Sequence, residues 1–317
     1  MVTTLTASAR ADYLNCQRQF LYKHVWRIQP HQDDEGEALF VGKMFHEALD
    51  ARAKGTHYDW PIPADHTQRE RILKTKAMFI AYCSKWGIDE AIDNAELEFN
   101  VPLVPGVRLL GKVDGLAGRT LIENKTASEV GPEYFERLPF DGQLHSYITA
   151  LERCGIQITS VRYDVTTRPR ISLQVEESEE DFNLRYAAAC AANKNGKSTA
   201  TRRMGETDEE FVNRCLPLVQ CIRGEFIIGD ADRAIFRDEL TLLAKELRLK
   251  AKKQHTAYLR NDRGCNQWHR TCSYMPLCRN NVDSVELAKR MGYVDKEPHK
   301  ELSRAVVAWK GGARCFR

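Results

Sequence analysis

The stretch VRLLGKVDGLAGRTLIENKT, residues 107–126, decides the fold class of this chain. Two runs with strand character, 107–116 and 120–126, lie on either side of the tripeptide Ala-Gly-Arg at 117–119. A three-residue connection that contains glycine is typical of a tight turn between two strands. The stretch therefore predicts a β-hairpin within a chain of 317 residues, which is long enough for a sizeable core.

Three charged side chains on this hairpin are the candidate catalytic residues. Side chains alternate along a strand, so Glu123 and Lys125 share one face, and strand pairing brings Asp114 beside Glu123. Two converging carboxylates suit Mg²⁺ or Mn²⁺, and such a metal polarises a phosphate and activates a bound water. The lysine can hold that water or stabilise charge on the phosphate. Taken alone, the same pattern is also that of a surface ion pair.

The segments around the hairpin alternate between helical and extended patterns. They predict an α/β protein in which helices pack on a sheet. Residues 193–203 are polar and basic, which is typical of a mobile loop, and they lie within a mostly helical region at 178–260. The expected helices are 7–27, 41–53, 67–86, 139–153 and 233–254, and the other expected strands are 95–103, 158–166 and 170–175.

Residues on two predicted helices add to the candidate site. His46 can supply a neutral imidazole to a metal, although a lone helical histidine is more often a core or surface residue. Gln143 and Tyr147 are four residues apart, so they share a helix face and could orient the carboxylates or DNA. The alternative for these two is the polar outer face of an ordinary amphipathic helix.

Together these residues resemble the motif set of a nuclease family. The order is His46, Gly-x-x-Asp114, Glu123-x-Lys125 and Gln143-x-x-x-Tyr147. It resembles the RecB-like branch of the PD-(D/E)XK nucleases, which includes nuclease domains of bacterial recombination helicase–nucleases, CRISPR-associated nucleases and many phage exonucleases. The resemblance implies that the His, Asp and Glu bind the metal, that the Lys is catalytic, and that the Gln and Tyr support the site and DNA.

The resemblance also implies an architecture and an activity. It runs from about Ser8 to Cys278 and implies a restriction-endonuclease-like fold, a mixed central β-sheet flanked by helices. A helical insertion and a cysteine cluster that joins the N- and C-terminal regions would complete this fold. The implied activity is hydrolysis of DNA with Mg²⁺ or Mn²⁺, and the family favours action on ends or single strands.

Three cysteines, Cys265, Cys272 and Cys278, have the spacing Cys-x6-Cys-x5-Cys. Thiolates this close in a reducing compartment suggest a bound metal. In the iron–sulfur members of the family one cysteine near the N-terminus joins three near the C-terminus, so the resemblance implies Cys16 as the fourth ligand of a 4Fe–4S cluster. The familiar spacing in those members is Cys-x2-Cys-x5-Cys. Zinc is therefore the alternative, with His269 as a possible substitute ligand.

The distribution of charge is more informative than the net charge of +3. Between residues 245 and 270 there are eight Lys or Arg against two acidic residues, a stripe able to neutralise phosphates. A solvated helix face is the alternative explanation of this stripe. The candidate DNA-binding residues are Lys250, Lys252, Lys253 and Arg260.

Length and hydropathy favour one domain in the cytoplasm, and the resemblance implies the cell of a bacterium or of a phage-infected host. No apolar run approaches the roughly 18 residues that span a bilayer, and the first residues lack the apolar centre of a secretion signal. We expect a nuclease domain over 1–280, least matched within about 178–260. We expect residues 281–317 to form a charged tail that packs only loosely.

The expected function is metal-dependent DNA hydrolysis, as an exonuclease in recombination, repair or phage DNA processing. The chain has no Gly-x-x-x-x-Gly-Lys-Ser/Thr motif, so ATP-driven unwinding would need a helicase or recombinase partner. One alternative is a non-catalytic DNA-binding or scaffold subunit that keeps the fold. Another is a metal hydrolase that acts on small molecules. No membrane partner is expected.

Overall fold

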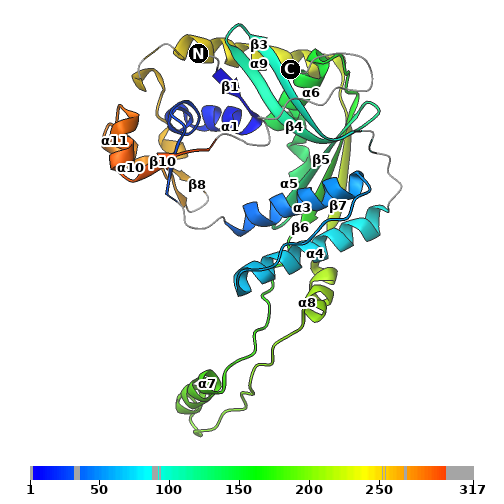
Figure 1. The fold of residues 1–317 in the computed structure, drawn as a ribbon, viewed down its shortest axis with the longest axis vertical. Helices are drawn as coiled ribbons and strands as arrows, with labels where there is room; N and C mark the ends of the chain where they lie inside the picture. The colour runs from blue at the N-terminus through cyan, green and yellow to red at the C-terminus, as the bar shows by residue number, and fades with distance from the viewer. Residues whose placement is uncertain are drawn as a thin grey trace.

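A six-stranded sheet lies at the centre of the molecule (Figure 1). The computed structural model describes residues 3–31, 36–87, 92, 94–251, 253, 255–267 and 270–297. The strands of this sheet are β1 (Thr3–Leu5), β3 (Asn94–Val104), β4 (Val107–Ala117), β5 (Thr120–Ala127), β6 (Ser160–Thr167) and β7 (Cys221–Ile227).

Strand β4 has a different set of partners on each edge. Along one edge β3 pairs with it antiparallel over nearly its whole length. The other edge is shared, because β1 pairs parallel with residues 107–109 and β5 pairs antiparallel with residues 115–117. Strand β6 then pairs parallel with β5, and β7 pairs antiparallel with β6. The sheet is therefore mixed, as predicted.

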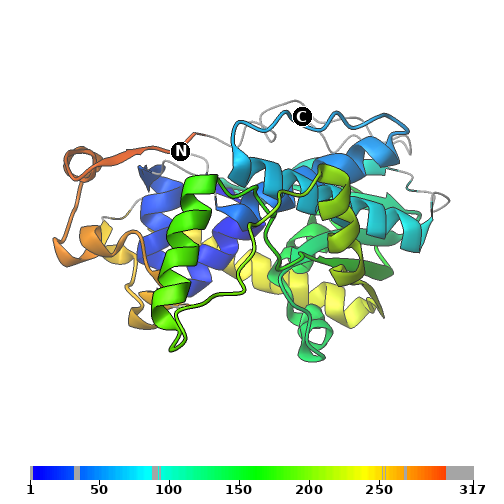
Figure 2. The same ribbon diagram turned by 90° about the horizontal axis from the view of Figure 1, so that it is seen from below.

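Helices cover both faces of the sheet (Figures 1 and 2). Consecutive residues of β5 point to opposite faces, and Glu123 contacts Gln143 of α6 whereas Asn124 contacts Tyr82 of α4. Helices α6 and α9 thus pack on one face together with α1, and α3 and α4 pack on the other. The longer helices are α1 (Ala7–Asn15), α3 (Glu37–Ala53), α4 (His66–Trp86), α6 (Gly142–Arg153), α7 (Glu179–Ala192), α8 (Asp208–Cys215) and α9 (Asp230–Lys250).

Short elements complete the chain. None of the described helices is long and apolar enough to cross a membrane. The short helices are α2 (Gln17–Phe20), α5 (Glu133–Glu136), α10 (Met275–Arg279) and α11 (Val285–Arg290), with a π-helical turn at Leu21–Val25 and 3₁₀ turns at Leu138–Phe140, Leu216–Leu218, His255–Ala257 and Asp262–Gly264. The short strands are β2 (Ile28–Pro30), β8 (Asn266–Gln267), β9 (Arg270–Thr271) and β10 (Tyr293–Asp295).

The main core lies between the sheet and the helices α1, α6 and α9. The apolar stripe of α6, formed by Leu144, Ile148 and Leu151, is buried in it. Gly111 of β4 lies under the ring of Phe99, and a Cβ at this position would come within 2.5 Å of that ring. The glycine therefore leaves room for the Phe99 ring to lie across β4, where it packs edge-on against Tyr147 of α6.

The prediction of one helix over residues 7–27 is wrong at its centre. The backbone of Cys16 is extended, with φ −156° and ψ 110°, and it separates α1 from α2. The break is stabilised from a distant part of the chain, because the backbone N–H of Arg18 donates to the carbonyl of Leu259 at 3.0 Å. The Arg18 guanidinium also donates to the carbonyl of Tyr258.

The prediction that the chain after Cys278 packs only loosely is wrong for its described part. Strand β10 pairs antiparallel with β2, so the region near residue 294 is tied to the region near residue 29. Tyr293 is buried, its ring stacks on Tyr274, and its hydroxyl donates to the carbonyl of Ser273. Residues 298–317 of the predicted tail lie outside the described residues.

One of two further predictions for the second half of the chain is wrong. Residues 170–175 form no strand, because the backbone N–H of Leu173 donates to Glu70 of α4 at 2.9 Å instead of to a neighbouring strand. The region 178–260 is mostly helical, as predicted, with α7, α8 and α9 in it, but β7 also lies within it and adds to the sheet at β6.

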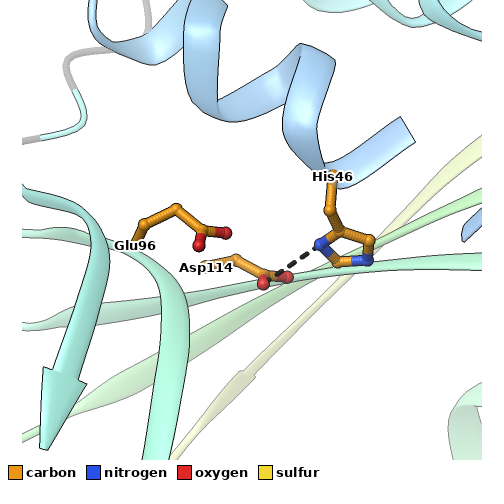
Figure 3. A group of neighbouring side chains, drawn as sticks. All are labelled: His46, Glu96 and Asp114. Carbon is orange, nitrogen blue, oxygen red and sulfur yellow. Dashed lines mark ion pairs between the residues drawn. The ribbon is translucent and has the colours of Figure 1, made fainter. Parts of the chain in front are cut away.

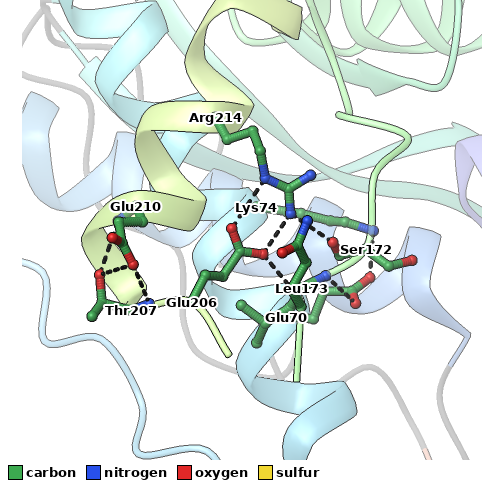
Figure 4. A network of polar contacts seen from close by, with 9 residues as sticks. Glu70, Lys74, Ser172, Leu173, Glu206, Thr207, Glu210 and Arg214 are labelled. Atoms are coloured by element: carbon green, nitrogen blue, oxygen red, sulfur yellow. Dashed lines mark hydrogen bonds and ion pairs between the residues drawn. The ribbon is translucent and has the colours of Figure 1, made fainter. Parts of the chain in front are cut away.

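The segment 168–206, called the arm below, extends from the body of the molecule and carries α7 at its far end (Figure 1). Helix α7 buries none of its residues. Polar contacts hold the base of the arm against α4 and α8 (Figure 4). Arg214 of α8 donates to the carbonyl of Ser172 at 2.8 Å and pairs with Glu206. Glu70 of α4 accepts from the backbone N–H of Leu173 and is itself held by Lys74 at 2.7 Å.

A small apolar cluster supports the same base. Phe211 of α8 is fully buried there, against Leu73 and Ala77 of α4 and Leu173 of the arm. We expect Phe211→Ala to lower the free energy of unfolding by about 3–5 kcal/mol, because the cavity that it leaves cannot be refilled. Urea unfolding followed by circular dichroism measures this change.

The matched control is Phe182→Ala on α7, where the ring contacts Tyr186 on a helix without buried residues. We expect a change within about 0.5 kcal/mol for it. Equal effects of the two substitutions would mean that the cluster around Phe211 does not hold the arm.

Candidate active site

The unpaired part of the β4 edge forms the floor of a polar pocket. Between Leu109, which pairs with β1, and Gly115, which pairs with β5, no strand among the described residues pairs with this edge. A pocket of about 570 Å³ opens there, and its walls come from α1, α3, β5 and α6. The pocket brings together His46, Asp114, Glu123, Lys125, Gln143 and Tyr147, the predicted catalytic and metal-binding residues.

Asp114 is held by groups from two other elements. Because β5 diverges from β4 beyond Ile122, the backbone N–H of Asn124 donates to the Asp114 carboxylate at 2.7 Å. His46 of α3 points at the same carboxylate, with Nδ1 3.2 Å from Oδ1 (Figure 3). Where the two strands of the hairpin separate, a backbone N–H of β5 is thus free to bind the Asp114 carboxylate.

Glu123 is almost fully buried, and only one of its oxygens is satisfied. Its Oε1 accepts hydrogen bonds from Lys125 Nζ and, at 2.8 Å, from Gln143 Nε2. Gln143 also donates to the hydroxyl of Tyr147 at 2.8 Å. The other oxygen, Oε2, is buried without a hydrogen-bond partner, which is costly for a carboxylate and leaves this atom available to a cation.

The charged side chains of the pocket shift one another's pKa values. Burial raises the pKa of Glu123 to about 7, and the charge of Lys125 opposes this shift while Asp114 adds to it. Burial acts to raise the pKa of Asp114 as well, but His46 and Lys125 hold it below its ordinary value. Burial acts to lower the pKa of His46, but Asp114 outweighs burial and raises it. Asp114 is therefore the anion of the pair, and Glu123 gains and loses its proton near neutral pH.

Glu96 is a site residue that sequence reasoning missed. Ligand atoms of His46, Glu96 and Asp114 lie within 4.8 Å of one another, and the three side chains converge in Figure 3. Glu96 lies on β3 between two residues that pair with the neighbours of Asp114, and its φ of 53° is in the left-handed region. The sequence carries no signal for this carboxylate, because the left-handed backbone at Glu96 depends on the surrounding structure.

A buried polar network supports the site from the opposite face of β5. Asp164 of β6 accepts two hydrogen bonds from Arg223, at 2.7 and 2.8 Å, and one from the hydroxyl of Tyr82 at 2.9 Å. The same hydroxyl lies 3.2 Å from the side-chain oxygen of Asn124. Since the backbone of Asn124 holds Asp114, the network fixes the residue between Glu123 and Lys125.

Two cations of the pocket were also not predicted. Arg10 of α1 lines it and lies against Gly142, where an added Cβ would come within 1.5 Å of its guanidinium. Lys112 of β4 lines it too and pairs with Glu96.

The predicted DNA-binding residues lie elsewhere. Lys250 pairs with Glu246 at 2.7 Å and lies over the ring of Tyr13. Lys253 is exposed, Arg260 borders the cysteine cavity, and Lys252 lies outside the described residues. Their role in DNA binding stays a prediction.

The four predicted cysteines line one cavity of about 330 Å³. Cys265 and Cys272 flank the hairpin of β8 and β9, and the backbone N–H of Cys272 donates to the carbonyl of Cys265 at 2.7 Å. The six-residue gap between Cys265 and Cys272 is thus spanned by this hairpin, and the two cysteines lie side by side. Cys278 comes from α10 and Cys16 from the break after α1, whereas His269 lies outside the described residues.

The family model described as the PD-(D/E)XK nuclease superfamily matches residues 4–279. The chain belongs to this superfamily. Its mixed sheet with flanking helices is the restriction-endonuclease-like fold of these nucleases, and the predicted fold class is confirmed. None of the curated proteins matches the chain.

Solved structures give remote similarities to this PD-(D/E)XK nuclease. A proposed exonuclease from Eubacterium rectale is 11% identical, with a TM-score of 0.46 over 87% of this chain and 92% of that chain. LHK-Exo, an alkaline exonuclease from Laribacter hongkongensis, is 15% identical, with a TM-score of 0.27 over 79% of this chain and 94% of that one. The complex of LHK-Exo with dAMP gives a TM-score of 0.30.

The affinity of the pocket for Mn²⁺ is expected to fall as the pH drops below about 7, because protonated Glu123 cannot bind a cation. Above that pH the carboxylate is already ionised, and the affinity should level off. Isothermal titration calorimetry in two buffers of different ionisation enthalpy measures both the affinity and the protons released.

The protonation of His46 contributes to the same dependence, so His46→Gln serves as the control. This variant should keep the part of the proton release that comes from Glu123, and Glu123→Gln should lose it. A Mn²⁺ affinity that is constant across this pH range would contradict the assignment of Glu123 as a ligand.

Proposed function

We propose that this PD-(D/E)XK nuclease is a metal-dependent deoxyribonuclease that hydrolyses phosphodiester bonds by attack of water. One observation carries the proposal. The unpaired edge of β4 opens a single pocket in which Asp114, Glu123 and Lys125 meet His46 and Gln143. A surface ion pair, the alternative for this pattern, would not be buried as Glu123 is.

The donor set of the pocket fits Mg²⁺ or Mn²⁺. Asp114, Glu123 and His46 would hold the metal, and Glu96 adds a further carboxylate. Oxygen ligands with one imidazole suit these cations, and the unpartnered Oε2 of Glu123 supplies a free ligand atom. When bound, such a cation supplies Lewis acidity toward the phosphate and toward a water.

The remaining side chains position the metal-binding carboxylates and stabilise the charge that develops in the reaction. In the proposed reaction Lys125 moves from Glu123 to donate a hydrogen bond to the water or to a phosphate oxygen, where its charge offsets the charge that develops. Gln143 keeps Glu123 in place through its amide, and Tyr147 fixes that amide by accepting its second N–H. Asn124 holds Asp114 through its backbone.

The substrate and setting follow from the resemblance of the motif set to RecB-like and phage enzymes. We propose exonuclease action on ends or single strands of DNA, in recombination, repair or phage DNA processing in the cytoplasm. A helicase or recombinase partner would supply unwinding.

The activity is tested with end-labelled single- and double-stranded DNA in Mg²⁺, Mn²⁺ or EDTA. We expect Lys125→Ala to lower the cleavage rate by at least about 100-fold while DNA affinity persists, because it removes charge stabilisation in the transition state. The matched control is Lys76→Ala on α4, a lysine that lies over the ring of Trp60 and should leave the rate unchanged.

Two outcomes would redirect the proposal. Wild-type protein that binds DNA but cuts none with either cation would be a DNA-binding or scaffold subunit. Rapid cutting of covalently closed circles would exclude a strict requirement for ends.

We further propose a 4Fe–4S cluster held by Cys16, Cys265, Cys272 and Cys278. The four thiols are free and line one cavity. Burial raises the pKa of Cys272, and Cys16, Cys278 and Cys265 raise it further, so four thiolates there need a cationic core to neutralise them. With all four positions taken by protein ligands, the cluster would be structural.

Metal analysis separates this cluster from zinc, which would use the same thiolates. We expect protein purified without oxygen to contain iron and sulfide and to absorb visible light. Cys16→Ser should lose both signals and melt at a lower temperature, because one of the ties between the end of α1 and the C-terminal region is then lost. Cys190→Ser on α7 is the control and should keep them. Stoichiometric zinc without iron would favour the zinc alternative.

A further inference from the structure

A second polar cavity lies beyond the end of β5, outside the catalytic pocket. It has a volume of about 510 Å³ and is formed where the chain leaves β5 and β6 and enters β7. Its polar lining combines two guanidinium groups with one carboxylate and with hydroxyl and amide groups: Arg168, Arg170, Glu129, Ser128, Thr167 and Gln220.

The cavity and the catalytic pocket lie along the same strand. Strand β5 carries Lys125 in the catalytic pocket, and its pairing with β6 continues to Ala127 opposite Thr167. One residue further, the backbone N–H of Arg168 donates to the carbonyl of Ala127 at 2.8 Å. Ser128 therefore follows Lys125 by three residues, which is about 10 Å of extended chain. This length corresponds to about three base steps of a DNA duplex.

The backbone of Arg168 is restricted, and one N–H group of its side chain has no acceptor. Arg168 precedes the buried Pro169, which restricts the Arg168 backbone to extended conformations. Its Nε is buried and has no hydrogen-bond partner. A buried N–H without an acceptor is unfavourable, so the Nε–H of Arg168 lacks an acceptor that a ligand could provide.

Arg170 has a partner that a ligand can displace. Its guanidinium donates to Glu129 at 3.0 Å, and both side chains are mostly exposed, at 63% and 77%. Ion pairs of this kind contribute little to stability, so an incoming anion can take the place of Glu129. Arginine forks match phosphate oxygens, and hydroxyl and amide groups are common additional donors to the DNA backbone.

We propose that this cavity binds the sugar–phosphate backbone of the DNA strand that occupies the catalytic pocket, a few nucleotides from the cleaved bond. The inference rests on the proposed nuclease function. It names Arg168 and Arg170 as phosphate contacts on a path that follows β5 from Lys125. These contacts fix the position of the strand and carry no base specificity.

The test compares Arg168→Gln and Arg170→Gln with a matched control at the other end of the same strand. Arg119→Gln changes an exposed arginine that donates to the carbonyl of Gln157, next to the turn before β5. Because Arg170 is exposed, its variant should fold even where Arg168→Gln does not, and melting temperatures check both.

The readouts are the dissociation constant for a single strand of about ten nucleotides and the KM and kcat of its cleavage. We expect each cavity variant to raise the dissociation constant and KM about tenfold at an unchanged kcat, and to lower the salt dependence of binding by about one charge. A dinucleotide substrate, which is too short to reach the cavity, should be cut equally well by variants and wild type. Arg119→Gln should match wild type throughout.

Three outcomes would overturn the proposal. These are unchanged binding of the long strand, equal weakening on the dinucleotide, and binding of inorganic phosphate or free nucleotide in the cavity without any effect on DNA. Failure of the nuclease proposal would give a different result from these three outcomes. Wild-type protein would then cut no DNA, yet binding of the long strand would still depend on Arg168 and Arg170.

Discussion

The sharing of one edge of β4 between two strands is the constraint on which the active site depends. Strand β3 occupies the other edge, β1 takes the beginning of this one, and β5 takes its end. The backbone between these pairings faces a pocket instead of a neighbouring strand. Because β5 diverges there, the N–H of Asn124 bonds the Asp114 carboxylate. The separation of β4 and β5 makes room for the catalytic pocket. It also frees the backbone N–H that orients the Asp114 carboxylate.

Burial of charge at this point requires compensation from every side. A buried and a partly buried carboxylate lie together, and Lys125 and His46 offset part of their charge while one oxygen of Glu123 stays without a partner. A divalent cation would complete the balance. On the opposite face of β5, Asp164 and Arg223 form a buried pair of their own, which keeps Asn124 in place without adding net charge.

Helix α1 connects the catalytic pocket to the cysteine cavity. Its first turn lines the pocket through Ser8 and Arg10, and the residue that ends it, Cys16, lines the cavity. Strand β10 closes the same region by pairing with β2. A cluster in the cavity would therefore hold the helix that forms one wall of the pocket. The two metal sites proposed for this chain share a structural element, although their chemistry is separate.

The sequence by itself determined the strands around the hairpin, the helices that carry His46 and Gln143, and the order of the motif residues, because these features depend on local alternation and spacing. It did not determine how β4 divides its edge, why residues 170–175 turn to Glu70 instead of pairing, or that β10 returns to β2. Nor could it indicate Glu96, whose left-handed backbone is tolerated only because the surrounding sheet holds it. Pairing between distant segments depends on which edges remain free after the rest of the chain has packed, and only the tertiary structure decides that.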